Sequence, residues 1–349
     1  MSQVVTTRSI IRTCTKIDSI FMELKQIFTR RSIKGQNYAQ PIIYEWEDVI
    51  AEKMSIPVKS YSSLYRIIDK LGIHSSLFGP SKDTFRFVIN GRNYDEPMNN
   101  KHIVPCIIDF FEKGEQLNEF YKKHSNNKLV LLSSPFDYQY LKDNECPLNI
   151  GLFAYSLSDK YVITDKVKEK KYDIVLTGRQ DPLLYSFFKK YVKKHPSVTY
   201  VKRGKDLEND SKKAQKYYVN GEECIGAIET REEFMQLQAQ GRATLYGVQG
   251  YINDERTKGF YHMTPHFLEI IACGCHVLAH YPTGPEGIDP KYYEFDKFSP
   301  SIESYDAFEM AMDHALSTDV DLNMYASYMK KHYTSARVME LQKLLVNLD

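Results

Sequence analysis

The chain has 349 residues, of which 46 are Lys or Arg and 45 are Asp or Glu. This near-neutral balance argues against a general nucleic-acid-binding protein, because such proteins are usually strongly basic. The length exceeds what one ordinary hydrophobic core fills, and it suits two α/β domains.

No stretch reaches the roughly 18 apolar residues that cross a bilayer, and the first 15 residues lack the apolar run of a signal peptide. The six cysteines have a spacing that fits neither a zinc site nor a disulfide framework. We therefore expect a cytoplasmic protein with reduced cysteines.

The first half of the chain alternates predicted helices and strands. Helical spacing of apolar residues predicts helices over 17–31, 41–54, 115–124 and 136–144. Apolar runs predict strands over 85–91, 102–110, 128–135 and 148–157. Strands that are apolar on both faces and alternate with helices indicate a parallel sheet with helices packed on it.

A charged segment, 158–173, is the predicted linker, after which the alternation starts again. The second half has predicted strands over 172–178, 198–203 and 243–251, and predicted helices over 181–195, 230–240, 301–316 and from Asp321 to Leu348. Residues 204–222 are polar and show no strong period. We expect an N-terminal domain over 1–165, a second α/β domain over 166–333, and a C-terminal helix over 334–349 that packs back on the first domain.

The most informative stretch, residues 256–281, reads as a basic loop, a helix and a buried strand. Thr264 is suited to cap the helix and Pro265 to its first turn. Gly274 is suited to end it. Glu269 is the one acid on an otherwise apolar helix, and a carboxylate there needs a partner if it is buried. Pairing with a nearby Lys or Arg, or simple exposure to water, is the alternative to a functional role.

Three segments resemble the GT-B glycosyltransferases, in particular those with a C-terminal "glycosyl transferases group 1" domain and the related CgeB-like domains. The segments are the strand and Gly-Arg loop YDIVLTGR (172–179), the segment FLEIIACGCHVLA (267–279), and a Gly/Pro-rich loop followed by the helix SIESYDAFEMAMDHAL (301–316). The resemblance covers roughly residues 170–320. It implies an α/β fold of GT-B type, with two Rossmann-like domains facing a cleft and C-terminal helices closing the chain.

The resemblance also implies roles for individual residues. Glu269 matches the glutamate that accepts hydrogen bonds from the ribose hydroxyls of the donor, and a carboxylate has two oxygens for a cis-diol. Gly178 and Arg179 match the loop that faces the diphosphate, where a guanidinium can clamp phosphate oxygens. The helix N-terminus near His262 and Thr264 would add N–H groups for phosphate.

The sequence departs from the family pattern at two places. The family often has a second acid eight positions before the one that matches Glu269, but here that position is Tyr261. The family's lysine shortly after the Gly-Arg pair is also missing, and Arg256 or Lys258 is the candidate to supply its charge. The first departure puts the contact with the transferred sugar in doubt, and CgeB-like relatives share it.

Other motifs carry less weight. His262 and His266 are four residues apart, which is a zinc-pair spacing, but no third ligand is apparent, so we expect no metal. The basic, aromatic segment FFKKYVKKH (187–195) suits either a solvated helix face or peripheral contact with anionic lipid. Asp109 follows a predicted strand and is placed to meet an acceptor hydroxyl.

We therefore expect a metal-independent, retaining glycosyltransferase, with Arg179, Lys258 and Glu269 as its catalytic set. Gly178, Arg179, Arg256, His262, Thr264 and Glu269 would bind the donor, a nucleotide-diphosphate sugar that acts as substrate, without a separate cofactor. The expected acceptor is a hydroxyl of a cell-surface glycan or a lipid-linked glycan, with no nucleic-acid partner. Two alternatives are a nucleotide-sugar epimerase of similar build and a non-catalytic protein that binds a nucleotide or sugar.

Overall fold

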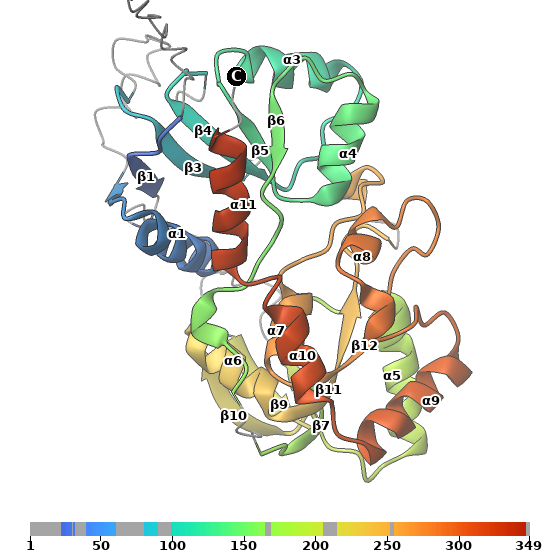
Figure 1. The fold of residues 1–349 in the computed structure, drawn as a ribbon. Coiled ribbons are helices and arrows are strands. Elements are labelled where there is room, and N and C mark those ends of the chain that lie inside the picture. Colours follow the sequence, from blue (N-terminus) through green and yellow to red (C-terminus); the bar gives the residue numbers. More distant parts are fainter. Residues whose placement is uncertain are drawn as a thin grey trace, which may run out of the picture.

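The computed structural model describes residues 22–29, 31, 40–60, 80–89, 99–164, 169–204, 215–251 and 255–346. These residues form two α/β halves, each built on a six-stranded sheet, which lie one above the other in Figure 1. None of the described helices is long and apolar enough to cross a membrane.

The N-terminal half contains a fully parallel sheet. In spatial order its strands are β2 (Val58–Ser60), β1 (Gln26–Thr29), β3 (Thr84–Ile89), β4 (Ile103–Ile108), β5 (Val130–Leu132) and β6 (Ile150–Leu152). All residues of β3, β4 and β5 are buried, as expected for parallel strands covered on both faces. The helices in the described part of this half are α1 (Gln40–Met54), α3 (Glu115–His124) and α4 (Pro135–Asp143).

One prediction in this half is wrong. The helix expected over 17–31 is contradicted by β1, whose four residues are all buried and which pairs in parallel with both β2 and β3. Residues 17–21 lie outside the described part. The apolar side chains near Ile27 therefore serve an internal strand of the sheet rather than one face of a helix.

The C-terminal half has a mixed sheet. In spatial order its strands are β10 (Glu223–Ile228), β9 (Gln215–Val219), β8 (Tyr200–Arg203), β7 (Tyr172–Leu176), β11 (Gly241–Gly247) and β12 (His276–His280). Strands β8, β7, β11 and β12 run parallel, whereas β9 is antiparallel to both β8 and β10. The sequence predicted neither β9 nor β10.

The described residues of this half form six helices. They are α5 (Pro182–Lys194), α6 (Arg231–Ala239), α7 (His266–Ala272), α8 (Ile288–Tyr292), α9 (Tyr305–Ser317) and α10 (Leu322–Met329). Local capping chemistry explains where several of them begin. Asp181 and Ser304 cap α5 and α9, and Thr230 forms a capping box with Glu233 at the start of α6. The expected starts of α5 and α6 are confirmed, whereas α9, expected from Ser301, begins four residues later because Ser304 is its cap.

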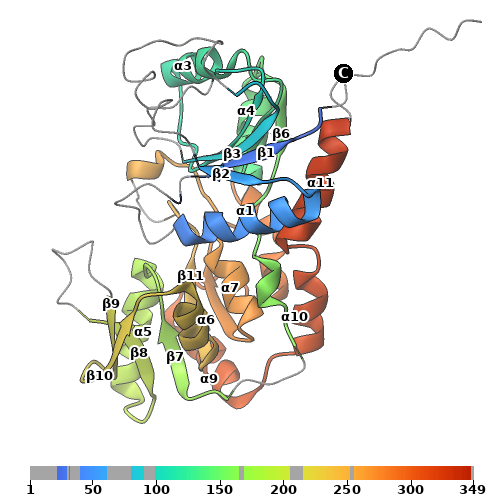
Figure 2. The same ribbon diagram turned by 90° about the vertical axis from the view of Figure 1, so that its left-hand side faces the viewer.

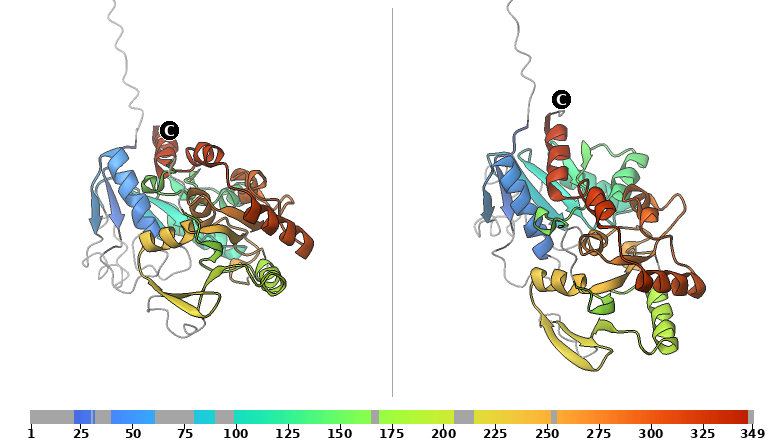
Figure 3. Two further views of the ribbon diagram at one scale, coloured as in Figure 1. Left: turned by 90° about the horizontal axis from the view of Figure 1, so that it is seen from below. Right: turned by 60° about the horizontal axis from the view of Figure 1, so that its bottom comes forward.

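The chain returns to the first half at its end. Helix α11 (Thr334–Val346) packs against α1 in the upper half of Figure 1. Figure 2 shows α1 lying between the first sheet and helices α6 and α7 of the second half. Seen from below, helices α5 and α9 lie on the opposite side of the second half from hairpin β9–β10 (Figure 3).

Candidate functional site

The two halves meet through segments that follow the carboxyl ends of their strands. Ser134 and Asp137 lie just after β5 in the first half, while His262 and Asp289 follow β11 and β12 in the second. Ser134 Oγ donates to Asp289, and His262 Nε2 lies 2.6 Å from Asp137 Oδ1. Open α/β sheets place their ligands at such carboxyl edges, so this junction is the candidate site.

Glu269 is positioned by helix α7. The helix ends in a Schellman motif, because Cys275 N donates to Ile270 O, Gly274 N donates to Ile271 O, and Gly274 has φ +64°. The expected stop at Gly274 is confirmed. The expected cap by Thr264 is wrong: Pro265 is the N-cap residue, with no side-chain hydrogen bond, and Thr264 N donates instead to Tyr246 Oη.

The carboxylate of Glu269 is buried between two basic side chains. Arg231 Nη1, from the first turn of α6, lies 2.8 Å from Oε1, and His266 Nδ1 lies 3.0 Å from Oε2. The Glu269 side chain is 3% exposed and that of His266 is 17% exposed. The sequence left open whether Glu269 pairs with a basic side chain or faces water. In the structure it is buried and pairs with Arg231.

These partners keep Glu269 ionised. Burial alone would raise the pKa of Glu269, but the charge of Arg231 and the hydrogen bond from His266 outweigh it, so the pKa lies below its ordinary value. An ionised carboxylate accepts hydrogen bonds at both oxygens and donates none. Glu269 therefore has the charge state that a hydroxyl-binding acid needs.

His266 links Glu269 to the Gly-Arg loop. Its Nε2 lies 3.4 Å from Thr177 Oγ1, and Thr177 immediately precedes Gly178 and Arg179. Gly178 has φ +67°, a conformation that glycine adopts readily, and both Gly178 and Arg179 are exposed. The structure thus brings Glu269 and the Gly178–Arg179 loop to the same edge of the second sheet.

His262 forms a buried pair across the two halves. Its side chain is 1% exposed, that of Asp137 is fully buried, and the imidazole stacks on Phe111 with ring centroids 5.0 Å apart. Burial alone would lower the pKa of His262, but the charges of Asp137, Asp289 and Asp109 raise it. His262 thus contributes a buried contact between the two halves.

Asp289 fixes the same junction through backbone groups. Its carboxylate accepts from Phe136 N at 2.8 Å and from Met263 N at 2.9 Å, one in each half. The N–H groups of Met263 and Thr264, which were expected to face a phosphate, are therefore engaged within the protein. Nearby Asp109 has φ +55°, which is uncommon for a residue other than glycine.

Lys258 lies on a loop that reaches the first half. Its Nζ is 2.6 Å from Gln116 Oε1, and its carbonyl oxygen accepts from Lys113 Nζ at 2.5 Å. Lys113 also lies over the ring of buried Phe260. Arg256 is part of the short 3-10 helix Glu255–Thr257 beside it, but its side chain lies outside the described part.

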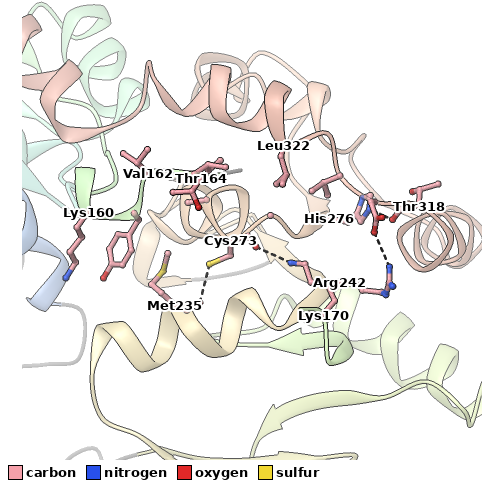
Figure 4. A pocket seen from close by; sticks show the side chains of 16 residues that line it. Lys160, Val162, Thr164, Lys170, Met235, Arg242, Cys273, His276, Thr318 and Leu322 are labelled. Atoms are coloured by element: carbon pink, nitrogen blue, oxygen red, sulfur yellow. Dashed lines mark hydrogen bonds and ion pairs between the residues drawn. The ribbon is translucent and has the colours of Figure 1, made fainter. Parts of the chain in front are cut away.

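A cavity of about 330 Å³ lies elsewhere, between the connecting segment near Lys160, the end of α7 and the α9–α10 loop (Figure 4). Arg242 and His276 on its wall begin strands β11 and β12, so the cavity is at the amino edge of the second sheet. Its lysines are occupied: Lys170 Nζ, for example, donates to the carbonyl oxygens of Ala239 and Cys273. This cavity is therefore separate from the candidate site.

Several residues of the junction were missed by sequence reasoning. Arg231, His266 and Asp289 were not assigned a role there. The capping box at Thr230 and Glu233 marked the start of α6, and hence placed Arg231 in its first turn. Nothing in the sequence indicates that this arginine meets Glu269, 38 positions later.

Comparison with known protein families finds no matching model, and comparison with curated protein sequences finds no match. Solved structures do match. S. aureus TarM, in a complex of a mutant with fondaparinux, alpha-GlcNAc-glycerol and UDP, has a TM-score of 0.50 and 13% identity, and the match covers 79% of this chain and 58% of TarM. The pneumococcal O-GlcNAc transferase GtfA, with UDP and GlcNAc, gives 0.46 and 10%, covering 81% and 59%.

Anabaena HepE, in complex with UDP and glucose, has a TM-score of 0.49 and 10% identity over 92% of this chain and 98% of HepE. This chain thus spans less than two thirds of the length of TarM and GtfA. The likeness to TarM shows the fold of this chain: an α/β protein of GT-B type, with C-terminal helices closing the chain.

Proposed function

We propose that this protein is a glycosyltransferase that moves a sugar from a nucleotide-diphosphate donor to a hydroxyl of a glycan or lipid-linked glycan. The observation that carries the proposal is the chain of contacts from Glu269 through His266 to Thr177, next to the exposed Gly178–Arg179 loop. It sets an ionised carboxylate and a cationic loop at one carboxyl edge, which is where a ribose and a diphosphate need them. TarM, which has the same fold, was crystallised with UDP.

The donor would engage Glu269 from the side of His266. His266 is the more exposed of the two partners of Glu269, so a ribose cis-diol can replace it on Oε2 while Arg231 stays on Oε1. Hydrogen bonds to a charged group contribute about 1.5–3 kcal/mol each. Loss of the carboxylate should therefore weaken donor binding about 10- to 100-fold.

Arg179 would hold the diphosphate, with Lys258 or Arg256 as a second cation. Lys258 lies on the loop that contacts α3 of the first half, so its position depends on how the two halves are arranged. Fixed cations that stabilise a departing diphosphate can do so without a metal ion. Retention at the sugar carbon and an envelope glycan as acceptor are parts of this proposal that rest on the sequence resemblance alone.

The test is a panel of UDP-, GDP-, CMP- and dTDP-sugars, incubated with the pure protein in the presence of EDTA. Free nucleotide is measured for the wild type, for Glu269→Gln, and for Glu255→Gln, an exposed glutamate of the same half. Release from one donor that is lost in Glu269→Gln and kept in Glu255→Gln supports the proposal. A new sugar nucleotide without release would identify an epimerase. Binding of a donor without release, even after a glycan acceptor is added, would identify a binding protein.

A further inference from the structure

Arg231 is a buried arginine shared by two carboxylates from different halves. Its side chain is 6% exposed. Nη1 lies 2.8 Å from Glu269 Oε1, and Nε lies 3.6 Å from Glu45 Oε1 on helix α1. Removing one member of a buried ion pair leaves an uncompensated charge, so such a group strongly constrains its neighbours.

Glu45 is itself held by the segment that connects the halves. Lys160 Nζ lies 2.7 Å from Glu45 Oε1, and Tyr161 Oη donates to the same oxygen at 2.8 Å. Lys160 also pairs with Glu232, the neighbour of Arg231 on α6. A continuous polar network therefore runs from α1, through the connecting segment and α6, to Glu269 on α7.

This network is incompletely satisfied. Arg231 Nε and Nη2, Glu45 Oε2 and Glu269 Oε1 are buried and lack a well-aligned hydrogen-bond partner among the described residues. A guanidinium has five N–H donors, so Arg231 can improve its pairing with one carboxylate by giving up part of its contact with the other. The two acids thus compete for one cation.

We propose that Arg231 is the positioning residue for Glu269 in donor binding, and that by sharing Arg231 with Glu45 the protein couples donor binding to the contact between its halves. This inference rests on the proposed function. Arg231 fixes one oxygen of Glu269 and leaves the other to the ribose. When a donor binds Glu269, the contact between Glu269 and Arg231 changes. The contact of Arg231 with Glu45 then changes as well, and with it the contact between α6 and α1.

The protonation of Glu269 gives a readout that a purely structural role would not move. The ionisable groups around Glu269 are His266 on its own helix, Arg231 on α6 and Tyr246 on β11. Glu45 on α1 and Tyr161 in the connecting segment act on Arg231. Without Arg231, burial would raise the pKa of Glu269. Donor affinity in an Arg231 variant should then fall at low pH, relative to wild type.

The experiment measures the Kd of the donor identified above by calorimetry at pH 5.5, 6.5 and 7.5. The proteins are the wild type, Arg231→Gln, Arg231→Lys and, as a matched control, Arg242→Gln, whose arginine pairs with Asp319 at the other edge of the sheet. We expect Arg231→Gln to bind at least 10-fold more weakly, with the ratio to wild type growing as the pH falls. Arg231→Lys should recover much of the affinity and Arg242→Gln should match wild type.

Coupling between the halves is tested with Glu45→Gln, alone and combined with Glu269→Gln. We expect the two effects on donor Kd to be non-additive by at least 3-fold, because both acids act on Arg231. Additive effects would overturn the coupling.

A wild-type Kd for Arg231→Gln, or a loss that is equal at all three pH values, would overturn the positioning role. If Arg231→Gln does not fold, Arg231→Met, which also removes the charge but keeps an apolar stem, is compared with wild type at the same three pH values. A wild-type protein that binds no nucleotide sugar would refute the proposed function, and this inference would fall with it. A wild type that binds a nucleotide sugar, together with Arg231 variants that bind it equally well, would refute this inference alone and leave the proposed function standing.

Discussion

His262 Nε2 lies 2.6 Å from Asp137 Oδ1, so a fully buried His–Asp pair joins the two halves of the protein. One partner follows β11 and the other belongs to α4, 125 positions earlier in the chain. Because neither side chain reaches solvent, the protonation state of this pair depends on the buried groups around it at the junction of the halves. Changes in pH should therefore act on the contact between the halves.

The first prediction concerns pH and stability. The pKa of His262 is raised in the folded state by Asp137, so its stabilising contribution is complete below the unfolded value near 6.5 and is lost as pH rises through the folded value. Burial raises the pKa of Asp137 to about 6, despite the opposing effect of His262, so the contribution of Asp137 is lost as pH rises toward 6, below the range in which His262 acts. Between pH 6.5 and 8.5 we expect the free energy of unfolding to fall by up to about 1.4 kcal/mol per pH unit.

Urea unfolding across this pH range is the measurement. His262→Gln should show a flatter dependence than wild type, whereas His314→Gln, on the exposed side of α9, should keep the wild-type slope. Glu269 does not contribute in this window, because its pKa is lowered and its effect is lost only as pH falls below its ordinary range. Equal slopes for wild type and His262→Gln would contradict the prediction.

The second prediction concerns Asp289. Replacing it with Ala leaves Met263 N and Ser134 Oγ as buried donors without their acceptor, while Phe136 N keeps Ser134 Oγ as a second acceptor. Each such donor costs about 1–3 kcal/mol, so we expect Asp289→Ala to lower the free energy of unfolding by about 3 kcal/mol. Asp296→Ala, an exposed aspartate of the same region, is the control and should change little. A loss below 1 kcal/mol in urea unfolding would show that Asp289 does not hold the junction.

Local chemistry in the sequence predicted much of the fold. Thr230 with Glu233, Asp181 with Pro182, and Gly274 each mark a helix end through contacts within a few residues, and each mark is confirmed. Alternation of apolar strands and helices likewise predicted two α/β halves. These features depend on short-range backbone and side-chain chemistry, which is visible in one sequence.

Features that depend on distant partners were not predictable in this way. Strand β1 was expected to be helical because its membership of the sheet depends on β2 and β3, which lie further along the chain. Strand β10 was missed because its first three residues, Glu223 to Ile225, are exposed and a glycine, Gly226, follows them, so the segment has no continuous buried apolar run. Glu269 was singled out correctly as the unusual acid of its helix, but its pairing with Arg231 is a tertiary contact.

The third prediction concerns the Gly178–Arg179 loop. Arg179 is exposed, so Arg179→Ala should leave the free energy of unfolding within about 0.5 kcal/mol of the wild-type value. If the guanidinium clamps the donor diphosphate, the same variant should bind the donor about 10- to 100-fold more weakly. Arg242→Ala, at the amino edge of the same sheet, is the matched control. Unchanged donor affinity would show that Arg179 does not bind the donor.

The fourth prediction concerns Lys258, whose Nζ meets Gln116 of the first half. If it supplies the second cation for the departing diphosphate, Lys258→Ala should lower kcat more than it raises KM, because charge develops on the diphosphate as it leaves. Lys291→Ala, on the exposed side of α8, is the control. Wild-type turnover by Lys258→Ala would show that Lys258 does not supply the second cation.

The fifth prediction separates backbone strain from packing at Gly274. This residue has φ +64°, and a Cβ there would lie 3.2 Å from Leu322 Cδ2 on α10. A left-handed conformation costs a residue with a Cβ about 1–2 kcal/mol, so Gly274→Ala should lose at least that much in free energy of unfolding. Gly178→Ala is the control, because Gly178 has φ +67° but a Cβ there meets no atom within 4 Å. A larger loss of stability at Gly274 than at Gly178 measures the contact between α7 and α10, whereas equal losses would show that Leu322 moves aside at little cost.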